Sequence, residues 1–170
     1  IPERYGGAPL SKVAYNLILE ELAWACASTS VTVAVHTSVA ASPIVEHGSE
    51  AVKERFLPKL ASGEWLGCFA LTEPGAGSDV AALATTAVKE GDHYRLNGSK
   101  DFITNGNHAG SAIFAAKTDP TAGHPRVSPF AVPTACEGCN KDAAEPKLVT
   151  RGLCPATLHA RQLMVLDADP

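Results

Sequence analysis

The hydrophobic pattern of the first third of the chain is helical. Between residues 10 and 28, apolar side chains recur every three or four positions, at Ala14, Leu17, Ile18, Leu22 and Ala25. This spacing predicts an amphipathic helix, and Ser11 occupies the position of its N-cap. Residues 49–62 predict another helix, with a break before Pro58 because proline lacks the amide hydrogen that a helix interior requires.

The segment between these two helices, residues 30–41, is apolar on nearly every side. Such a run fits either a buried helix or a strand. Its alanines and its length favour a buried helix, whereas its valines and threonines favour a strand. We expect Pro43 to end this element and to restart the chain.

After Gly63 the pattern changes to short segments with β-branched residues and turn signals between them. Hairpin turns are predicted at Glu90-Gly91-Asp92 and at Asn97-Gly98, since Asn-Gly is the strongest short hairpin signal. The predicted fold class is therefore α+β: an N-terminal helical domain over residues 1–66, followed by an antiparallel β domain over residues 67–170.

Composition and charge exclude some classes of partner. The 170 residues are 45% hydrophobic and carry a formal net charge of −4, so no basic surface favours nucleic acid or an anionic membrane. No apolar run approaches the roughly 20 residues that span a bilayer. Five cysteines without dense spacing indicate reduced thiols. Cys136 and Cys139 form a C-x-x-C that is either a zinc site with Cys154 and His159 or a pair of surface or half-buried thiols.

The loop ALTEPGAGSD, residues 70–79, is the most distinctive candidate for chemistry. It lacks the third glycine of a dinucleotide-binding G-x-G-x-x-G, the Gly-Lys-Ser/Thr of a P-loop and the G-x-S-x-G of a nucleophile elbow. Two interpretations remain open from residue types alone. The glycines and the hydroxyls of Thr72 and Ser78 suit an anion-binding nest, and Pro74 with Gly75 equally suits a plain turn.

Several stretches together resemble the acyl-CoA dehydrogenase family. They are IPERYGG, EELAWACAS, GSEAVKERFLPKLASGEW, CFALTEPGAGSDVAAL and HYRLNGSKDFITNG, in the family's order. The resemblance implies an N-terminal helical domain, a middle β-barrel-like domain, bound FAD and oxidation of an acyl-CoA thioester between its α and β carbons. It also implies electron-transfer flavoprotein as acceptor, a homo-oligomer for the full-length protein, and a bacterial cytoplasm or mitochondrial matrix as location.

The resemblance also implies roles for single residues. Phe69, Leu71 and Thr72 would lie along the flavin ring, and Gly77 and Ser78 would meet the FAD pyrophosphate or the CoA-ester side, which makes Ser78 the substrate-binding candidate. The second flavin segment would consist of Phe102, Ile103 and Thr104, with Phe102 where the family frequently has Trp.

Two departures from the family pattern affect the expected activity. The family's general base belongs to a C-terminal helical domain that this sequence does not include, so we expect no catalytic residue here, weak FAD binding and no turnover. Glu73 is the tempting substitute base, although a role in orienting the loop backbone fits it better. Residues 134–170 diverge from the family, as a shifted reading frame would produce. The alternatives are an acyl-CoA oxidase, a nitroalkane-oxidising flavoprotein and an inactive remnant.

Overall fold

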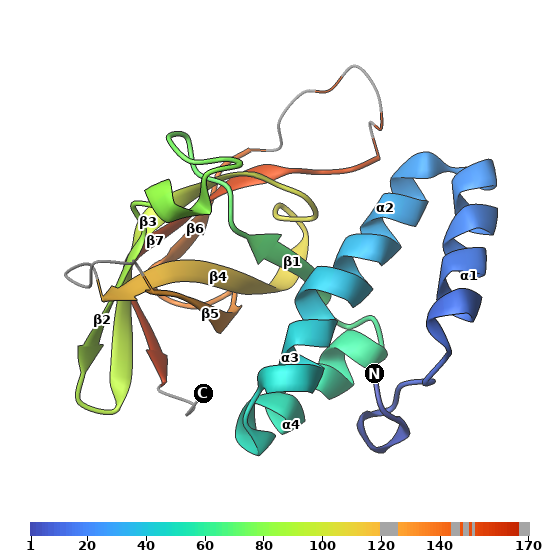
Figure 1. The fold of residues 1–170 in the computed structure, drawn as a ribbon, viewed down its shortest axis with the longest axis horizontal. Helices are drawn as coiled ribbons and strands as arrows, with labels where there is room; N and C mark the ends of the chain where they lie inside the picture. The colour runs from blue at the N-terminus through green and yellow to red at the C-terminus, as the bar shows by residue number, and fades with distance from the viewer. Residues whose placement is uncertain (120–125, 144–146, 148–149, 151, 167–170) are drawn as a thin grey trace.

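The computed structural model describes residues 1–119, 126–143, 147, 150 and 152–166. Helices gather on one side of the molecule and strands on the other (Figure 1). The helical elements are η1 (Glu3–Tyr5), α1 (Lys12–Ala25), α2 (Ala27–Val35), the π-helix η2 (His36–Ala41), α3 (Ser42–His47), α4 (Glu50–Ala61) and η3 (Val80–Ala82). The strands are β1 (Leu66–Ala70), β2 (Thr86–Glu90), β3 (His93–Ile103), β4 (Ala109–Asp119), β5 (Arg126–Pro133), β6 (Cys139–Lys141) and β7 (Ala156–Leu166).

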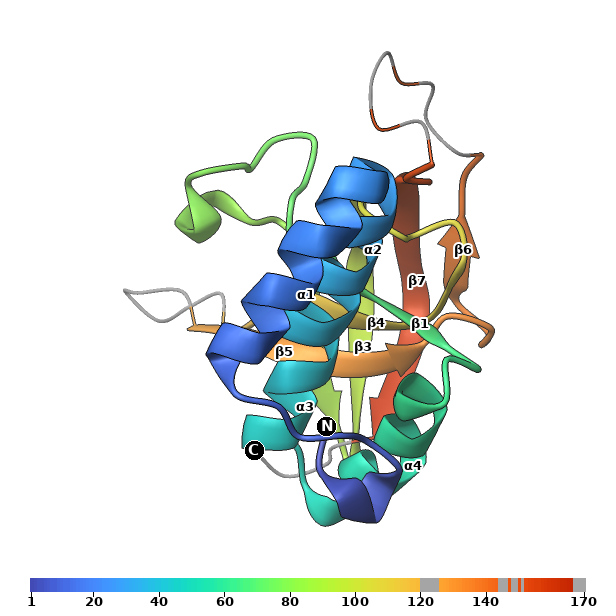
Figure 2. The ribbon, with the colours of Figure 1, turned by 90° about the vertical axis from the view of Figure 1, so that its right-hand side faces the viewer.

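The first predicted helix is confirmed as α1. The Ser11 side chain caps it by accepting a hydrogen bond from the Ala14 amide at 3.2 Å. Helix α1 is the outermost element, and α2 lies between it and the sheet (Figures 1 and 2). None of the described helices is both long and apolar enough to cross a membrane.

Residues 30–41 are helical, which settles the choice between helix and strand. The expected restart at Pro43 is wrong, because α2, η2 and α3 follow one another without a break. The proline is the second residue of α3 and follows a π-helical turn that ends at Ala41, so it lies in the first turn of α3, where a missing amide hydrogen is tolerated.

Helix α4 is confirmed, but the predicted break before Pro58 is wrong. Pro58 lies inside the helix, near its C-terminus and exposed to solvent. Phe56, Leu57 and Leu60 are buried on either side of it. Their burial outweighs the one backbone hydrogen bond that the proline removes.

One hairpin prediction is confirmed and one is wrong. Gly91 and Asp92 form the turn between β2 and β3, with Glu90 paired to His93 and Gly91 at a φ of +65°. Asn97 and Gly98 lie inside β3 instead, at a break in its register with β7. The Asn97 side chain fills that break by accepting a hydrogen bond from the Gln162 amide at 2.9 Å.

The α+β fold class is confirmed, with two corrections to the sheet. The strand order is β1-β4-β2-β3-β7-β6, with β5 paired to β4. Both β1 and β2 run parallel to β4, so the sheet is mixed and not purely antiparallel. No pairing among the described strands joins the two ends of this order, so the term barrel-like is loose.

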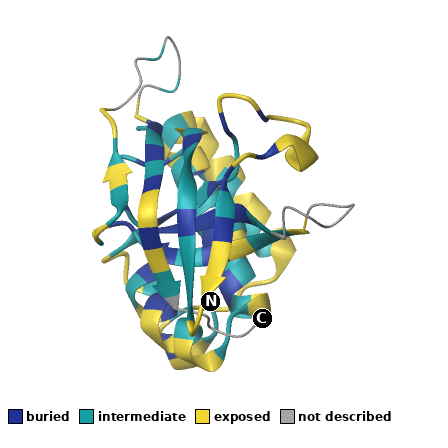
Figure 3. Cartoon of the chain, turned by 90° about the vertical axis from the view of Figure 1, so that its left-hand side faces the viewer, coloured by how far each residue is buried: buried dark blue, intermediate teal, exposed yellow. Residues whose placement is uncertain are grey.

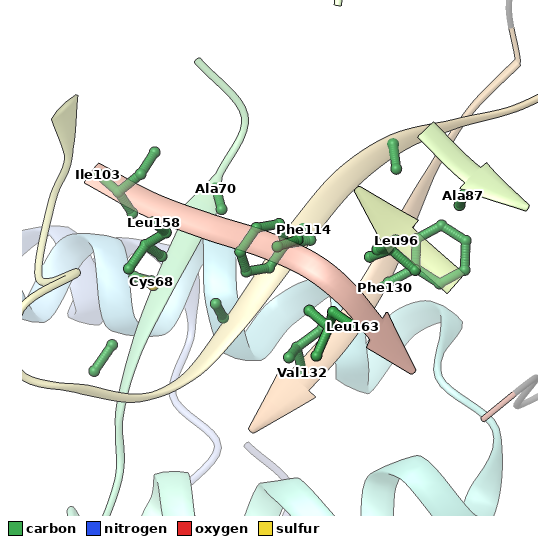
Figure 4. Packing of buried hydrophobic residues seen from close by; sticks show 14 residues of the cluster. Cys68, Ala70, Ala87, Leu96, Ile103, Phe114, Phe130, Val132, Leu158 and Leu163 are labelled. Carbon is green, nitrogen blue, oxygen red and sulfur yellow. The ribbon is translucent and has the colours of Figure 1, made fainter. Parts of the chain in front are cut away.

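Residues 134–170, which we expected to diverge from the family, contribute a full strand, β7. β7 pairs with β3 along its length, and its Ala156, Leu158, Ala160 and Leu163 are buried. Leu158, Ala160 and Leu163 join Ile103, Phe114, Val132 and others in the main hydrophobic core (Figure 4). A second core connects α3 and α4 to the sheet, and it includes Trp65 stacked edge-on against Phe56.

Candidate functional site

Two segments singled out in the sequence lie side by side: the loop of residues 70–79 and the end of β3. The Asp101 amide donates a hydrogen bond to the Thr72 carbonyl oxygen at 2.8 Å. The Lys100 ammonium donates to the Leu71 carbonyl oxygen at 3.1 Å. Thr72 and Thr104 therefore lie on neighbouring segments and not on opposite sides of the molecule.

A buried ion pair holds the base of this loop. Lys100 Nζ lies 2.7 Å from Glu73 Oε1, and the two side chains are 0% and 5% exposed. Glu73 also accepts hydrogen bonds from the Ala84 amide at 2.6 Å, from the Thr85 amide at 3.0 Å and from the Thr85 hydroxyl. One carboxylate thus ties the start of the loop both to β3 and to the segment that precedes β2.

The protonation of this pair follows from its contacts. Burial raises the pKa of Glu73, but the hydrogen bonds from Lys100, Thr85 and Ala84 outweigh that effect and leave the pKa below its ordinary value. Burial lowers the pKa of Lys100, and the Glu73 carboxylate opposes that change. Because Glu73 is buried and already accepts four hydrogen bonds, this geometry favours the backbone-orienting role over a role as general base.

Beyond Glu73 the loop projects into solvent. A short bridge closes it, with the Glu73 and Ala76 main chains donating to each other at 2.9 and 3.1 Å. A Cβ added to Gly75 or Gly77 would meet no atom within 4 Å. The main chain at the tip is therefore open to a ligand, as an anion-binding nest requires.

The end of β3 has an unusual backbone. Phe102 is 63% exposed and adopts a φ of +55°, which is rare for a residue with a bulky side chain. Asn105, at a φ of +67°, is buried, and its side-chain amide donates to the carbonyl oxygens of Thr32 and Gly67 at 3.2 Å each. Strain of this kind collects at functional sites, and here it turns an aromatic ring outward.

The predicted site residues divide into two groups. The side chains of Phe69, Leu71 and Ile103 pack into three different hydrophobic clusters, which leaves mainly their backbones for a ligand. The others are partly or fully exposed: Thr72, Gly77, Ser78, Phe102 and Thr104. Within the described part of the chain, the hydroxyls of Thr72, Ser78 and Thr104 have no hydrogen-bond partner. Hydroxyls without a described partner and an exposed aromatic ring are groups that suit a planar polar ligand.

Sequence reasoning missed three residues that shape this site: Lys100, Asn105 and His36. His36 connects the helices to the sheet, because its Nδ1 accepts a hydrogen bond from the Gly67 amide at 3.0 Å and its Nε2 bonds the Leu60 carbonyl oxygen at 3.1 Å. Burial lowers the pKa of His36, so the neutral ring is favoured. Of the three, only Lys100 could have been found from the local sequence. It lies four residues after Leu96 on β3, so the alternation of a strand places both side chains on the inward face.

The cysteine motif has the geometry of half-buried thiols. The Cys139 amide donates to the Cys136 carbonyl oxygen at 3.2 Å, and burial raises the pKa of Cys139 to about 11. The described residues contain no group of three or more His, Cys, Asp or Glu side chains that could hold a metal ion. Within those residues, Cys154 and His159 therefore do not complete a zinc site with the motif.

Two family models match most of the chain. The acyl-CoA dehydrogenase N-terminal domain matches residues 1–64, and the acyl-CoA dehydrogenase middle domain matches residues 68–162. The short-chain specific acyl-CoA dehydrogenase of Clostridium acetobutylicum is 42% identical over 163 residues, which are 96% of this chain and 43% of that protein.

Two solved structures share the fold. A chain in a structure of the electron transferring flavoprotein of Acidaminococcus fermentans has a TM-score of 0.93 and 37% identity, covering 99% of this chain and 44% of that one. The acyl-CoA dehydrogenase of Bacillus anthracis complexed with FAD has a TM-score of 0.89 and 37% identity, over 99% of this chain and 28% of that one. The chain thus spans less than half the length of these relatives. Since the two domain matches together cover most of its residues, the chain belongs to the acyl-CoA dehydrogenase family.

Proposed function

We propose that this chain is the flavin-facing part of an FAD-dependent acyl-CoA dehydrogenase. The observation that carries the proposal is the main-chain hydrogen bond from the Asp101 amide to the Thr72 carbonyl oxygen. It places the loop of residues 70–79 next to the end of β3, where Phe102 is exposed. Among the described residues, there is no hydrogen-bond partner for the hydroxyls of Thr72, Ser78 and Thr104. The relative from Bacillus anthracis is described as complexed with FAD, which supports the same cofactor here. Bound flavin supplies hydride acceptance from the β carbon of an acyl thioester.

The residues that would hold the cofactor are those of the paired segments. The hydroxyls of Thr72 and Thr104 would donate to the polar edge of the ring, and Phe102 would pack on its face. The open main chain at Gly77 and the hydroxyl of Ser78 would face a phosphate or the thioester side of the substrate. The buried Lys100–Glu73 pair would orient these groups without touching the ligand.

The relatives support one class of substrate and one class of electron acceptor. A short-chain specific relative at 42% identity supports an acyl-CoA thioester with a short acyl chain as substrate. The match to a chain in an electron transferring flavoprotein structure supports that class of protein as acceptor. A homo-oligomer, and a location in a bacterial cytoplasm or a mitochondrial matrix, remain predictions from the family resemblance.

The 170-residue chain by itself should bind FAD weakly and turn over no substrate. Its predicted contacts cover one side of the ring only, and Glu73 is already occupied by internal donors. A few hydrogen bonds worth about 0.5–1.5 kcal/mol each do not outweigh the free-energy cost of association.

Flavin fluorescence tests the proposal. Titrating the chain into FAD should quench the flavin emission weakly and saturably, and Phe102→Ala should abolish that response. Met164→Ala is the matched control, because Met164 is also a large exposed apolar residue, 48% exposed, but lies on β7. The absence of any saturable quenching would favour an inactive remnant, and equal quenching by the Phe102 variant would contradict the proposed role of Phe102. Retention of FAD through gel filtration would contradict the weak binding.

A further inference from the structure

A serine on β3, a histidine on β7 and an aspartate after β6 form a continuous hydrogen-bonded chain. Ser99 Oγ lies 2.8 Å from His159 Nδ1, and His159 Nε2 lies 2.9 Å from Asp142 Oδ2. Ser99 on β3 and His159 on β7 are direct cross-strand partners, and Asp142 directly follows β6, which also pairs with β7. The register of three strands, and not a single loop, therefore fixes this arrangement.

The carboxylate determines which nitrogen of His159 carries the proton. An ionised aspartate only accepts hydrogen bonds, so the bond to Asp142 requires a hydrogen on Nε2. In the neutral ring Nδ1 then has a free lone pair, and the Ser99 hydroxyl donates to it. This is the pattern of a nucleophile, a general base and a group that orients the base. The two ring nitrogens are exchanged relative to the best-known serine triads.

The arrangement lies on the outer face of the sheet. Leu96 and Lys100 on β3 and Leu158 and Ala160 on β7 point inward, so Ser99 and His159 point outward. The side chains of His159 and Asp142 are 19% and 58% exposed. Figure 3 views the molecule from this side, with the strands in front and the helices behind. Solvent and small molecules can therefore reach the site.

Two charged neighbours complete the surroundings. Arg161 lies two residues after His159 on β7, is exposed, and has no side-chain partner among the described residues. Its guanidinium can stabilise negative charge that develops on a carbonyl oxygen. Asp101 accepts a hydrogen bond from the Thr157 hydroxyl at 3.0 Å and so does not compete for His159.

We propose that Ser99 is a nucleophile that accepts a small acyl group from an activated acyl ester. Ser99 Oγ attacks the carbonyl carbon while His159 Nδ1 takes the hydroxyl proton, and the carbonyl electron pair moves onto oxygen. When the tetrahedral adduct collapses, the bond to the leaving group breaks and that group receives the proton from His159. The products are a Ser99 ester and a free alcohol, with no change of oxidation state. Asp142 is a positioning residue that stabilises the imidazolium.

The test uses p-nitrophenyl acetate with the full chain, followed by intact mass and peptide mapping. One acetyl group should appear on Ser99, and Ser99→Ala should remove it. His159→Gln should slow acetylation of Ser99 by roughly 10²- to 10⁴-fold, the usual contribution of a general base. His108→Gln is the matched control, because His108 is exposed and lies outside the hydrogen-bonded chain. Circular dichroism shows whether each variant is folded.

The role of Asp142 needs a readout that folding alone would not change. Asp142→Glu should keep more of the rate of Ser99 acetylation than Asp142→Ala. Acetylation confined to lysine or cysteine side chains would overturn the proposal, and so would an unchanged Ser99 rate in the folded His159 variant. Neither result depends on whether the chain binds flavin.

Discussion

A lysine is completely buried in the sheet region of this protein, whereas a tryptophan is 85% exposed in the helical region. Lys100 is inside because Glu73 and the Leu71 carbonyl oxygen satisfy its ammonium group. Trp24 is outside together with Leu17 and Val13, and α1 has no buried residue at all. The available partner, more than hydropathy, therefore decides which side chains are buried in each region.

The same contrast explains how the two regions are joined. The later helices contact the sheet through a shared core and through His36 and Asn105, whereas α1 contacts mainly α2. Gly67 permits the close approach of β1 to the helices, because a Cβ at this position would lie 2.6 Å from the Ala40 Cβ. The stability of the helical region should accordingly depend on this junction and very little on α1.

The largest effect should come from breaking the buried ion pair. Lys100→Met leaves the Glu73 carboxylate buried without its cation, which should lower the free energy of unfolding by about 3–5 kcal/mol in urea denaturation. Adding Glu73→Gln should recover part of the loss, because it removes the unpaired charge. Arg4→Met is the control at the exposed Arg4–Glu50 pair, where about 0–1 kcal/mol is expected. Equal losses of stability in Lys100→Met and Arg4→Met would show that burial of the Lys100–Glu73 pair does not matter.

The sequence predicted much of the fold because much of it depends on local patterns. The α1 spacing with its Ser11 cap and the Gly91-Asp92 turn are both local, and both are present. The errors arose where distant contacts prevail. Pro58 is tolerated because its neighbours are buried, and Asn97-Gly98 stays in a strand because Gln162 of β7 fills the bulge.

The same division applies to the candidate site. The loop of residues 70–79 and the end of β3 were recognisable from their residues, but what holds them together was not. Glu73 and Lys100 are far apart in sequence, and the Asn105 amide reaches back to Thr32 and Gly67. No periodicity reports such long-range pairs, although the alternation along β3 places Lys100 on the inward face.

An intermediate effect should appear in the pH dependence of stability through His36. Burial holds its folded pKa below the ordinary value of about 6.5, so the unfolded chain binds the proton first as pH falls. Stability is full above about pH 6.5 and should decline below it, by at most about 1.4 kcal/mol per pH unit, until the folded pKa is passed.

Comparison of two histidine variants isolates this effect. His36→Gln should flatten the decline between about pH 6.5 and 4.5, whereas His47→Gln, at an exposed position, should leave it unchanged. Glu73 has a lowered folded pKa, so its own contribution is present above about pH 4.5 and is lost as pH falls further. Thermal unfolding across this range is the measurement. If the stability of His36→Gln still declines over this pH range, a group other than His36 causes the decline.

The smallest effect on stability should come from a substitution in α1, and it compares the helical region with the sheet region directly. Leu17→Ala should change the free energy of unfolding by less than about 0.5 kcal/mol, because Leu17 is 56% exposed and little packing is lost. The same change at the fully buried Leu158 should cost about 2–5 kcal/mol. A large cost for Leu17→Ala would contradict this expectation and would mean that a second copy covers this face in solution. In that case the cost should fall on dilution, because dissociation returns Leu17 to solvent, whereas the cost at Leu158 should not depend on protein concentration.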